Sequence, residues 1–517
     1  MPSPTDSGDL FMLQFLSVFL FFFFLSTQLF SDTMSSFRIL SRGVDLAAAR
    51  VAALHTPRAS IGSTLLRREL SSAAIVPTTS RALRSNAPLA VTASQSAPQA
   101  VRYASTTSSE PLSQTQLYNL HVERGAKMVP FAGFDMPLVY ADMSHVESHM
   151  WTREKASLFD VSHMVQHHLS GPGAAELLKK ITPSSVDKLA PNTSTLSCLL
   201  EEGTGGMVDD CVITRRTEDT FYFVTNAGRR TEDLAFLTAE IEAYRSKNGA
   251  DSIKWDILSD RALVALQGPL AASVLQPLIN TANTPSSETD LSTLYFGNCR
   301  ELYLTLPDGS ATPHPLLISR TGYTGEDGFE ISIPTTSGAP NLPNQVTELL
   351  LADSSKSRLA GLAARDSLRL EAGMCLYGHD ISTAQTPPAA ALGWVVGRDR
   401  RDAATATFNG ASTILSQIAS PKTIPQRRVG LTVEKGPPAR EGAIVVDISD
   451  PANIVEVGVV TSGLPSPSLG GTNIAMAYVK QGLHKKGTEL GVKVRNKVRK
   501  ATVGGMPWVE SKFHRPQ

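Results

Sequence analysis

Two adjacent carboxylates follow a glycine pair in the segment 205–215, GGMVDDCVITR. Paired glycines are typical of a tight turn, and the apolar residues after them predict a strand. Because successive side chains of a strand point to opposite faces, Asp210 is expected on the face of Val212 and Asp209 on the opposite face. A carboxylate that points inward needs a partner, and a bound ligand is one candidate. The alternative is an exposed turn in which both carboxylates are solvated.

A third carboxylate lies in the segment 319–333, SRTGYTGEDGFEISI, which predicts a strand, a glycine-rich turn and a second strand. Phe329 and Ile331 share one face of the second strand, so Glu330 points to the other face. Glu330 is either solvent-exposed surface or an acceptor for a ligand, because one carboxylate accepts two parallel N–H bonds from an amidine or guanidine edge.

The segment 361–378, GLAARDSLRLEAGMCLYG, predicts a helix with two arginines one turn apart. Asp366 and Glu371 are available as ion-pair partners of Arg365 and Arg369. Surface ion pairing is one interpretation of these charges. The other is recognition of a ligand carboxylate or oxo group by a fixed, planar guanidinium fork.

A further polar cluster lies in the segment 159–164, FDVSHM. On composition alone, His163 and Met164 are best assigned to the core or to a turn. A position beside a ligand is the alternative for both side chains.

The elements that carry these clusters alternate along the chain. Helical spacing or a helix cap is found at 115–123, 145–156 and 234–244, and strand patterns are found at 221–225 and 262–266. Strands and helices in this order predict an α+β or α/β body with short connections, to which we assign residues 115–390.

The pattern changes toward the C-terminus. Apolar runs separated by turn residues follow one another, namely RRVGLTV, AIVVDI, VEVGVVTSG, IAMAYV and LGVKVRNKVRKATVGG. Regularly spaced strands of this kind predict an all-β domain, a barrel or a sandwich, at residues 426–510. The preceding stretch 391–425 is rich in charged and small residues, and we assign it as a connector.

The composition excludes several classes of protein. The 517 residues include 48 basic and 48 acidic side chains, and the resulting net charge of +0 argues against nucleic acid as a partner. The four cysteines form no CxxC pair, so a zinc ribbon, an iron–sulphur ligand set and a disulfide scaffold lose support, and no metal site is expected. No GxxxxGK[ST] motif and no GxGxxG motif after a strand is present, which argues against the simplest nucleotide, FAD and NAD sites.

The N-terminal part of the chain has a different composition. Residues 1–33 form an apolar extension, whose run at 10–30 carries no charge and is long enough to span a bilayer. Residues 34–104 contain nine arginines, no lysine and two acidic residues, which is typical of a mitochondrial transit peptide. A disordered, low-complexity tail is the alternative. We expect cleavage of the transit peptide near Arg102.

Two interpretations of residues 1–33 stay open. They are either a membrane anchor or translated sequence upstream of a start at Met34. The second is favoured, because a hydrophobic span ahead of an arginine-rich segment would compete with import into the mitochondrial matrix. It predicts a mature protein of the matrix that is not bound to a membrane.

Segments from across the chain together resemble the aminomethyltransferases, the T-proteins of the glycine cleavage system. They are FAGFDMPLVY, SLFDVSHM, GGMVDD, TGYTGEDGFEIS, GLAARDSLRLEAGMCLYG and TSGLPSPSLG. The resemblance runs in order from residue 117 to residue 509. It implies an α+β fold: a three-domain, cloverleaf-like body, two of whose domains are intertwined and α+β, with a central tetrahydrofolate channel and a C-terminal all-β barrel.

The resemblance also implies an activity. In this family the one-carbon unit of the aminomethyl group on the lipoyl arm of the H-protein is transferred to tetrahydrofolate, the co-substrate, and ammonia is released. The products are 5,10-methylenetetrahydrofolate and dihydrolipoyl H-protein. The implied partners are the lipoylated H-protein and, with it, the decarboxylase and dihydrolipoyl dehydrogenase components of the system.

Site residues are implied where the motifs match. Asp210 matches the catalytic Asp of a GG-x-x-DD motif, and Glu330 matches the Glu that holds the aminopyrimidine edge of the pterin. A carboxylate in a poorly hydrated channel suits the reaction, because positive charge develops on the transferred carbon and the folate nitrogen. Further residues match folate-contacting positions, namely Arg365, Tyr323, Asn226, Val212 and Met164.

Two positions depart from the family pattern. Phe513, which we also assign to folate binding, stands near a C-terminal Tyr or Arg of the family, and Thr214 stands where a Tyr can occur. Both departures concern recognition of the folate tail rather than of the pterin.

Three rival functions differ from this interpretation in testable features. Folate-dependent halves of dimethylglycine and sarcosine dehydrogenases carry an FAD-binding unit, whose fingerprint this chain lacks. Non-catalytic folate-binding proteins of iron–sulphur assembly carry a KGCYxGQE-like motif, where this chain has EAGMCLYGHD at 371–380. A membrane-tethered module that docks lipoyl proteins would rest on the apolar run alone and would leave Asp210 idle. The aminomethyltransferase is therefore favoured.

Overall fold

The computed structural model of the protein describes residues 111–516. The predictions for residues 1–33 and 34–104 lie outside the described residues. Within the described part, no helix combines the length and the apolar character that crossing a membrane requires.

A helix, a hairpin and a second helix come first. They are α2 (Tyr118–Glu123), β1 (Ala126–Phe131), β2 (Phe134–Tyr140) and α3 (His145–Glu154), with β1 and β2 paired in an antiparallel sheet. A capping box starts α3, because the Ser144 hydroxyl accepts from Glu147 N and the Glu147 carboxylate accepts from Ser144 N. Both expected helices are present but shorter: α2 begins only at Tyr118, because the Thr115 hydroxyl donates to Asp160 and does not cap it, and α3 ends before Ala156, which begins a buried strand.

The body contains a six-stranded sheet with the strand order β10-β11-β12-β9-β3-β13. Its strands are β3 (Ala156–Asp160), β9 (Arg261–Gln267), β10 (Cys299–Leu302), β11 (Leu316–Ser319), β12 (Gly328–Pro334) and β13 (Ser357–Leu359). Neighbouring strands are antiparallel, except that β13 and β3 are parallel. On one face of this sheet, Val264 and Ile331 share a core with residues of α6 (Ala271–Leu275) and α7 (Leu342–Leu350).

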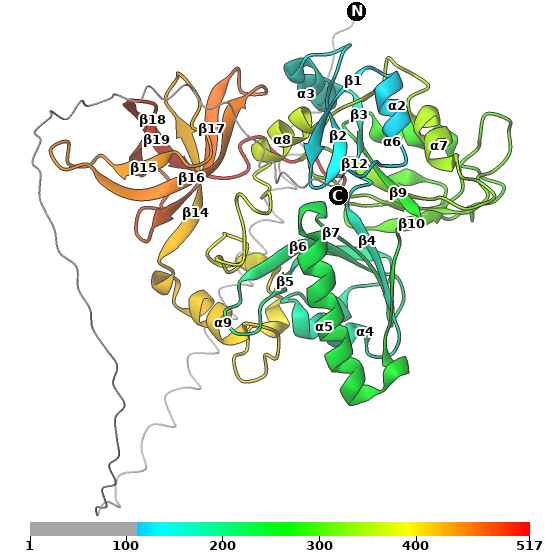
Figure 1. The fold of residues 1–517 in the computed structure, drawn as a ribbon, viewed down its shortest axis with the longest axis horizontal. Helices are drawn as coiled ribbons and strands as arrows, with labels where there is room; N and C mark the ends of the chain where they lie inside the picture. Colours follow the sequence, from blue (N-terminus) through cyan, green and yellow to red (C-terminus); the bar gives the residue numbers. More distant parts are fainter. Residues whose placement is uncertain (1–110, 517) are drawn as a thin grey trace, which may run out of the picture. The chain divides into compact units, whose positions relative to one another are not determined.

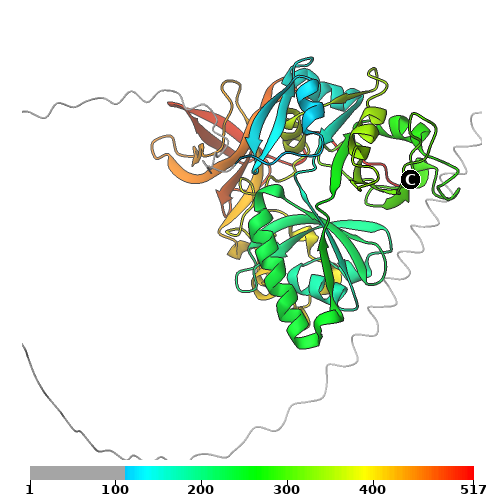
Figure 2. The same ribbon diagram turned by 45° about the vertical axis from the view of Figure 1, so that its right-hand side comes forward.

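A second sheet has five strands in the order β5-β6-β7-β4-β8, and all neighbours are antiparallel. The strands are β4 (Val165–Ser170), β5 (Thr193–Leu200), β6 (Met207–Arg215), β7 (Thr220–Thr225) and β8 (Lys254–Ile257). Two helices, α4 (Ala174–Ile181) and α5 (Arg230–Asn248), cover one face, where Leu177, Ile213 and Leu237 share a core. The longer of them, α5, is the long green helix beside the sheet in Figure 2.

The C-terminal strands form a closed barrel in the order β14-β17-β16-β15-β18-β19. They are β14 (Gln426–Val433), β15 (Ile444–Asp447), β16 (Val455–Ser466), β17 (Thr472–Lys480), β18 (Glu489–Val494) and β19 (Lys497–Gly504). Apolar side chains such as Leu431, Val445 and Val479 fill the barrel core. The mixed sheets of the body and this barrel confirm the predicted fold class, α+β with a C-terminal all-β barrel (Figure 1).

The segment between α8 (Leu362–Glu371) and the barrel packs against the five-stranded sheet. It contains α9 (Ala411–Ala419), and Phe408 and Ile414 share a core with Leu200 of β5 and Met207 of β6. Short 3-10 helices complete the described elements: η1 (Val186–Lys188), η2 (Ala227–Arg229), η3 (Ala250–Ser252), η4 (Gln276–Leu278), η5 (Leu291–Thr293), η6 (Gly393–Val395), η7 (Arg398–Arg400) and η8 (Pro421–Thr423).

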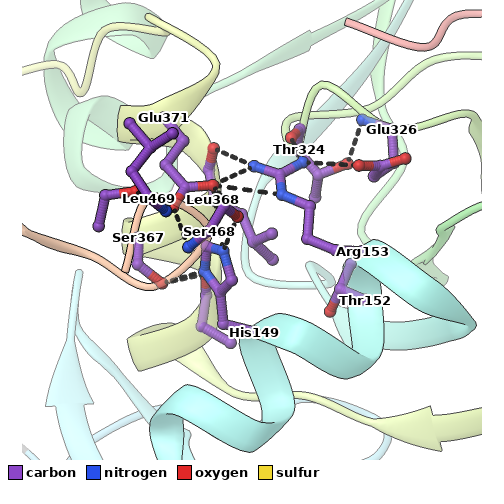
Figure 3. Close-up of polar contacts among 12 residues, drawn as sticks. His149, Thr152, Arg153, Thr324, Glu326, Ser367, Leu368, Glu371, Ser468 and Leu469 are labelled. Atoms are coloured by element: carbon purple, nitrogen blue, oxygen red, sulfur yellow. Dashed lines mark hydrogen bonds and ion pairs between the residues drawn. The ribbon is translucent and has the colours of Figure 1, made fainter. Parts of the chain in front are cut away.

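A buried ionic network joins the body to the barrel (Figure 3). Arg153 of α3 lies between two carboxylates, with Nη2 2.8 Å from Glu371 Oε2 and Nη1 3.0 Å from Glu326 Oε1. Glu371, at the end of α8, also accepts hydrogen bonds from the backbone N–H and the hydroxyl of Ser468, just after β16. Burial raises the pKa of Glu371, but hydrogen bonds and the charge of His149 outweigh it and bring the pKa to about 2.

The charges of α8 are therefore not surface ion pairs. Glu371 pairs with Arg153 rather than with an arginine of its own helix. Arg369 is only 3% exposed and pairs with Asp366 at 2.8 Å and with Asp380, which also accepts a hydrogen bond from β16. These contacts span distant parts of the sequence, so helical spacing alone indicated the Asp366 partner and not the others.

Candidate active site

The two sheets of the body each present one face to a shared apolar cluster. Its members include Leu263 and Ala265 of the six-stranded sheet and Tyr222 and Val224 of the five-stranded sheet. Directly opposed residues of neighbouring strands lie on the same face of a sheet. Glu330 is opposite Ala265, and Val212 is opposite Val224. Because Asp210 shares its face with Val212, Asp210 and Glu330 lie on the two faces that meet at this cluster.

Asp210 is held by Asn226. The Nδ2 atom of Asn226 is 2.8 Å from Asp210 Oδ1 and 2.9 Å from Asp209 Oδ1, and the backbone N of Asn226 is 2.8 Å from Asp209 Oδ2. One amide group therefore bridges the two carboxylates. Asp209 is fully buried against Asp233 of α5, whereas Asp210 is partly exposed on the other face. The opposite orientations expected from strand alternation are thus present.

The glycine pair before β6 fixes the place of these carboxylates. Gly205 has a φ of 70°, in the left-handed region that favours glycine. A Cβ on Gly206 would overlap the carbonyl oxygen of Thr383, so the close approach of the two backbones requires glycine. The next residue, Met207, donates its N–H to the carbonyl of Gln385 at 3.1 Å. The predicted tight turn therefore anchors the start of β6.

The electrostatic environment of the partly exposed Asp210 carboxylate is unusual. Burial raises its pKa to about 7, and the neighbouring Asp209 carboxylate adds to the rise. No Lys, Arg or His within residues 111–516 forms an ion pair with Asp210, and no group of three or more His, Cys, Asp or Glu there is arranged to hold a metal ion. A carboxylate with such a pKa can accept a proton near neutral pH and can stabilise a positive charge that develops beside it.

Glu330 lies in the middle of β12, between Ser319 of β11 and Ala265 of β9. Its Oε2 accepts a hydrogen bond from the hydroxyl of Thr321 at 2.9 Å. Burial raises the pKa of Glu330, whereas the Thr321 hydroxyl and the charge of Arg365 lower it. No other residue of the described part donates a hydrogen bond to Glu330, so Oε1 is available to a ligand donor.

Arg365 and Tyr323 lie against each other. The guanidinium carbon of Arg365, on α8, is 4.6 Å from the centre of the Tyr323 ring, and the Tyr323 hydroxyl donates to the carbonyl of Cys375. Burial raises the pKa of Tyr323, and the nearby Asp210 carboxylate adds to the rise. Since no acceptor in the described chain bonds the Arg365 guanidinium, its planar fork is available to a ligand carboxylate or oxo group.

The apolar candidates divide into two groups. Met164 is partly buried and packs against the cluster between the sheets, and Val212 lies on the same face as Asp210. Phe513 instead stacks on Phe296 with the ring centroids 4.0 Å apart. Its contacts are therefore with the segment before β10 and not with the apolar cluster.

Two residues beside the site were absent from the sequence prediction. Thr321 holds Glu330, and Asp233 is fully buried next to Asp209. Asp233, Leu237 and Ile241 recur every four residues and form the buried stripe of α5. Asp233 directly precedes the expected helix 234–244 at the spacing of its apolar residues, which was the available signal, whereas Thr321 had none.

Family models match both parts of the chain. The GCVT N-terminal domain matches residues 117–400, and the glycine cleavage T-protein C-terminal barrel domain matches residues 426–510. The two-sheet body followed by a closed barrel is therefore the architecture of this class of protein.

Several similar proteins are named as aminomethyltransferases. Aminomethyltransferase, mitochondrial, from Saccharomyces cerevisiae is 45% identical over 409 residues, which are 78% of this chain and 96% of the relative. The mitochondrial aminomethyltransferase of Pisum sativum is 45% identical over 406 residues, 78% of this chain and 91% of the relative. The crystal structure of the glycine cleavage system aminomethyltransferase T from Bartonella henselae has a TM-score of 0.66 and 37% identity, and the match covers 78% of this chain and 99% of that one.

The chain belongs to the glycine cleavage T-protein family. Membership confirms the resemblance seen in the sequence. The protein is an enzyme with aminomethyltransferase activity, and its location is mitochondrial.

Proposed function

We propose that the chain catalyses the tetrahydrofolate-dependent step of glycine cleavage, with Asp210 as its catalytic carboxylate. The aminomethyl group arrives on the lipoyl arm of the H-protein, its one-carbon unit passes to tetrahydrofolate, and ammonia leaves. The products are 5,10-methylenetetrahydrofolate and dihydrolipoyl H-protein. The observation that carries the proposal is the placement of Asp210 and Glu330 on sheet faces that meet, with Arg365 and Tyr323 nearby.

The residues of this region suit a folate. Glu330 has a carboxylate with a single hydroxyl donor, which fits the paired N–H donors of an aminopyrimidine. Arg365 presents planar donors beside the Tyr323 ring, which fits an oxo or carboxylate group. Met164 and Val212 add apolar contacts. Tetrahydrofolate, when bound, supplies the amine nitrogens that receive the one-carbon unit.

Asp210 contributes charge where the reaction needs it. Asn226 donates to Asp210 Oδ1 and so fixes the orientation of the carboxylate. With a pKa near 7, Asp210 is basic enough to accept an amine proton and acidic enough to be ionised in much of the population at neutral pH. Preorganised stabilisation by one such group is typically worth about 10²–10³ in turnover.

The partners and the location follow from the same proposal. The lipoylated H-protein is the donor, and the decarboxylase and dihydrolipoyl dehydrogenase components complete the system. The site of action is the mitochondrial matrix, which the mitochondrial names of the Saccharomyces and Pisum relatives support. We assign residues 115–390 to the catalytic body, 391–425 to a connector and 426–510 to the barrel domain, and Phe513 to the folate tail.

Reconstitution tests the proposal. The purified chain is mixed with aminomethylated H-protein and tetrahydrofolate, and ammonia and methylenetetrahydrofolate are both quantified. H-protein without lipoate is the control. We expect the two products in equal amounts, and only when the lipoylated protein is present. Tight folate binding without either product would contradict the proposal and favour a non-catalytic folate-binding protein.

A further inference from the structure

Helix α5 places a carboxyl group directly behind the proposed site. We propose that Asp233 is a positioning residue, which holds the proton of a buried carboxyl pair with Asp209 so that the pair orients the Asn226 amide toward Asp210. The inference rests on the proposed function of Asp210. Asp233 acts through Asp209 and Asn226 and does not touch the substrate.

The Asn226 side chain is shared between two carboxylates. Its Nδ2 donates to Asp210 Oδ1 at 2.8 Å and to Asp209 Oδ1 at 2.9 Å, which uses both amide hydrogens. The backbone N–H of Asn226 donates to the second oxygen of Asp209 at 2.8 Å. Because Asn226 engages both oxygens of Asp209, the direction of its amide depends on Asp209. A displaced Asp209 would therefore turn the amide away from Asp210.

Asp233 is the residue that backs Asp209. It lies on the buried stripe of α5 with Leu237 and Ile241 and has no exposed surface. No hydrogen bond from another residue of the described part meets either of its carboxylate oxygens, and the Asp209 carboxyl is its neighbour. The Thr225 hydroxyl and the charge of Arg229 lower the pKa of Asp233, but burial outweighs both, so an ionised Asp233 is costly in this position. A protonated Asp233 instead donates its O–H to Asp209, and both groups are then satisfied.

One cation acts on the pair, because the charge of Arg229 lowers the pKa of Asp233, although burial outweighs it. The Nη1 atom of Arg229 is 2.9 Å from Glu232 Oε1, and its Nε–H donates to the backbone carbonyl of Val208 in β6. His167 of β4, which contacts a threonine hydroxyl of β7, is neutral because burial lowers its pKa to about 3. Burial raises the pKa of the thiols of Cys198 and Cys211, which keeps them neutral as well.

Two more groups face this region. Burial raises the pKa of Tyr377 to about 12, so its hydroxyl is neutral. The positive charge of Arg230 lowers the pKa of His167 and so also favours the neutral imidazole. The pair therefore experiences burial and like charge, which the Thr225 hydroxyl and the charge of Arg229 oppose only in part. Burial and the neighbouring carboxylate raise the pKa of Asp209, and burial raises the pKa of Asp233. The pair keeps a proton at neutral pH.

This proton links pH to the position of Asn226. With one proton, the pair carries a single negative charge, and the N–H bonds from Asn226 place that charge on Asp209. When the proton leaves at alkaline pH, two like charges lie side by side in a buried site and repel each other. Asp209 then moves and releases the amide that orients Asp210. The transfer rate therefore falls on the alkaline side.

Variants of Asp233 test the inference. Asp233→Asn keeps the shape and gives Asp209 a permanent N–H donor, so kcat at neutral pH is expected to fall by no more than about threefold and the alkaline decline to disappear. Asp233→Ala removes the donor and is expected to lower kcat at least about tenfold, with the folate Kd within about threefold. Glu232→Gln, the half-exposed neighbour on the same helix, is the matched control and should behave as the natural chain.

The outcomes separate this inference from the proposed function. An unchanged kcat in Asp233→Ala, or an alkaline decline that persists in Asp233→Asn, would overturn the role of Asp233 while Asp210 still acts. A natural chain without transferase activity would instead overturn the proposed function.

Infrared spectroscopy tests the shared proton without catalysis, and it also decides the question if Asp233→Ala fails to fold. The full chain is labelled with carbon-13 aspartate and carries Asp210→Asn, which removes the other carboxyl of the site. We expect the C=O band of a protonated aspartate at neutral pH, and its loss when Asp233→Asn is added. A missing band in the first protein, or a band that persists in the second, would overturn the inference.

Discussion

Two buried acidic clusters of this chain differ in whether a cation accompanies them. At Glu371, Arg153 and His149 lie within ion-pair distance, and the pKa of Glu371 is about 2. At Asp210, no basic side chain of the described residues forms an ion pair, and burial raises the pKa to about 7. The first cluster has one charge state and joins α3, α8 and the barrel. The second changes its charge near neutral pH, which is the property that the proposed catalytic role of Asp210 requires.

Removal of the cation from the first cluster is expected to have the largest effect. Arg153→Met leaves the Glu371 carboxylate buried without its main partner, and we expect the free energy of unfolding to fall by about 3–5 kcal/mol in denaturant titration. Arg124→Met is the control, because the Arg124–Glu348 pair is half exposed and is expected to cost at most about 1 kcal/mol. Similar losses from the two variants would remove the distinction between the clusters.

Neutralising Asp210 is expected to act on rate rather than on stability. Asp210→Asn keeps the shape and one acceptor but removes the charge, so kcat should fall by about 10²–10³ while the folate Kd changes little. Asp209→Asn, on the other strand face, should lower kcat less. Both variants are assayed with aminomethylated H-protein. Equal damage from the two would mean that the catalytic role is not particular to Asp210.

Glu330 offers a third comparison, because it is a carboxylate assigned to binding. Glu330→Ala leaves a ligand donor edge without its acceptor, at a cost of about 1–3 kcal/mol, so the tetrahydrofolate Kd should rise more than about tenfold. Calorimetric titration measures this Kd. Glu489→Ala, an exposed glutamate of β18, is the control and should leave the Kd unaffected. An unchanged Kd in Glu330→Ala would assign Glu330 to a structural role.

The pH dependence of stability should have opposite signs for the two clusters. The folded-state pKa of Glu371 lies below its ordinary value, so its contribution is present above about pH 4.5 and is lost as the pH falls toward about 2. The pKa values of Asp209 and Asp233 are raised by burial, so their contribution is full below about pH 3.8 and is lost as the pH rises. Urea unfolding across this range should show that Glu371→Gln removes the acid dependence and Asp233→Asn the dependence at higher pH. The same curve shape for both variants would contradict the comparison.

Local patterns in the sequence predicted the elements better than the contacts between them. Strand alternation separated Asp209 from Asp210 correctly, and the regular apolar runs predicted the barrel strands, because both depend only on neighbouring residues. Helix α6 ends at Leu275, since the proline at position 277 lacks the N–H that would continue it.

The electrostatics of the two clusters depended on tertiary structure. Glu371 was expected beside the arginines of its own helix, yet its cation is Arg153, 218 residues earlier in the chain. Asp233 reaches Asp209 only because α5 folds back on β6. The sequence singled out Asp210, Glu330 and Glu371 but not Asp233, and only the fold shows that Glu371 has a cation beside it and Asp210 has none in the described residues.

The pH–rate profile of the natural chain tests the central claim most directly, because the claim is that Asp210 is ionised only above an unusually high pKa. With saturating H-protein and tetrahydrofolate, kcat should fall as the pH decreases through about 7, since protonation of Asp210 removes the charge that the reaction uses. Denaturation is monitored in parallel, so that loss of folded protein is not mistaken for titration. A kcat that stays level down to about pH 5 would mean that Asp210 has an ordinary carboxyl pKa, and it would contradict the account.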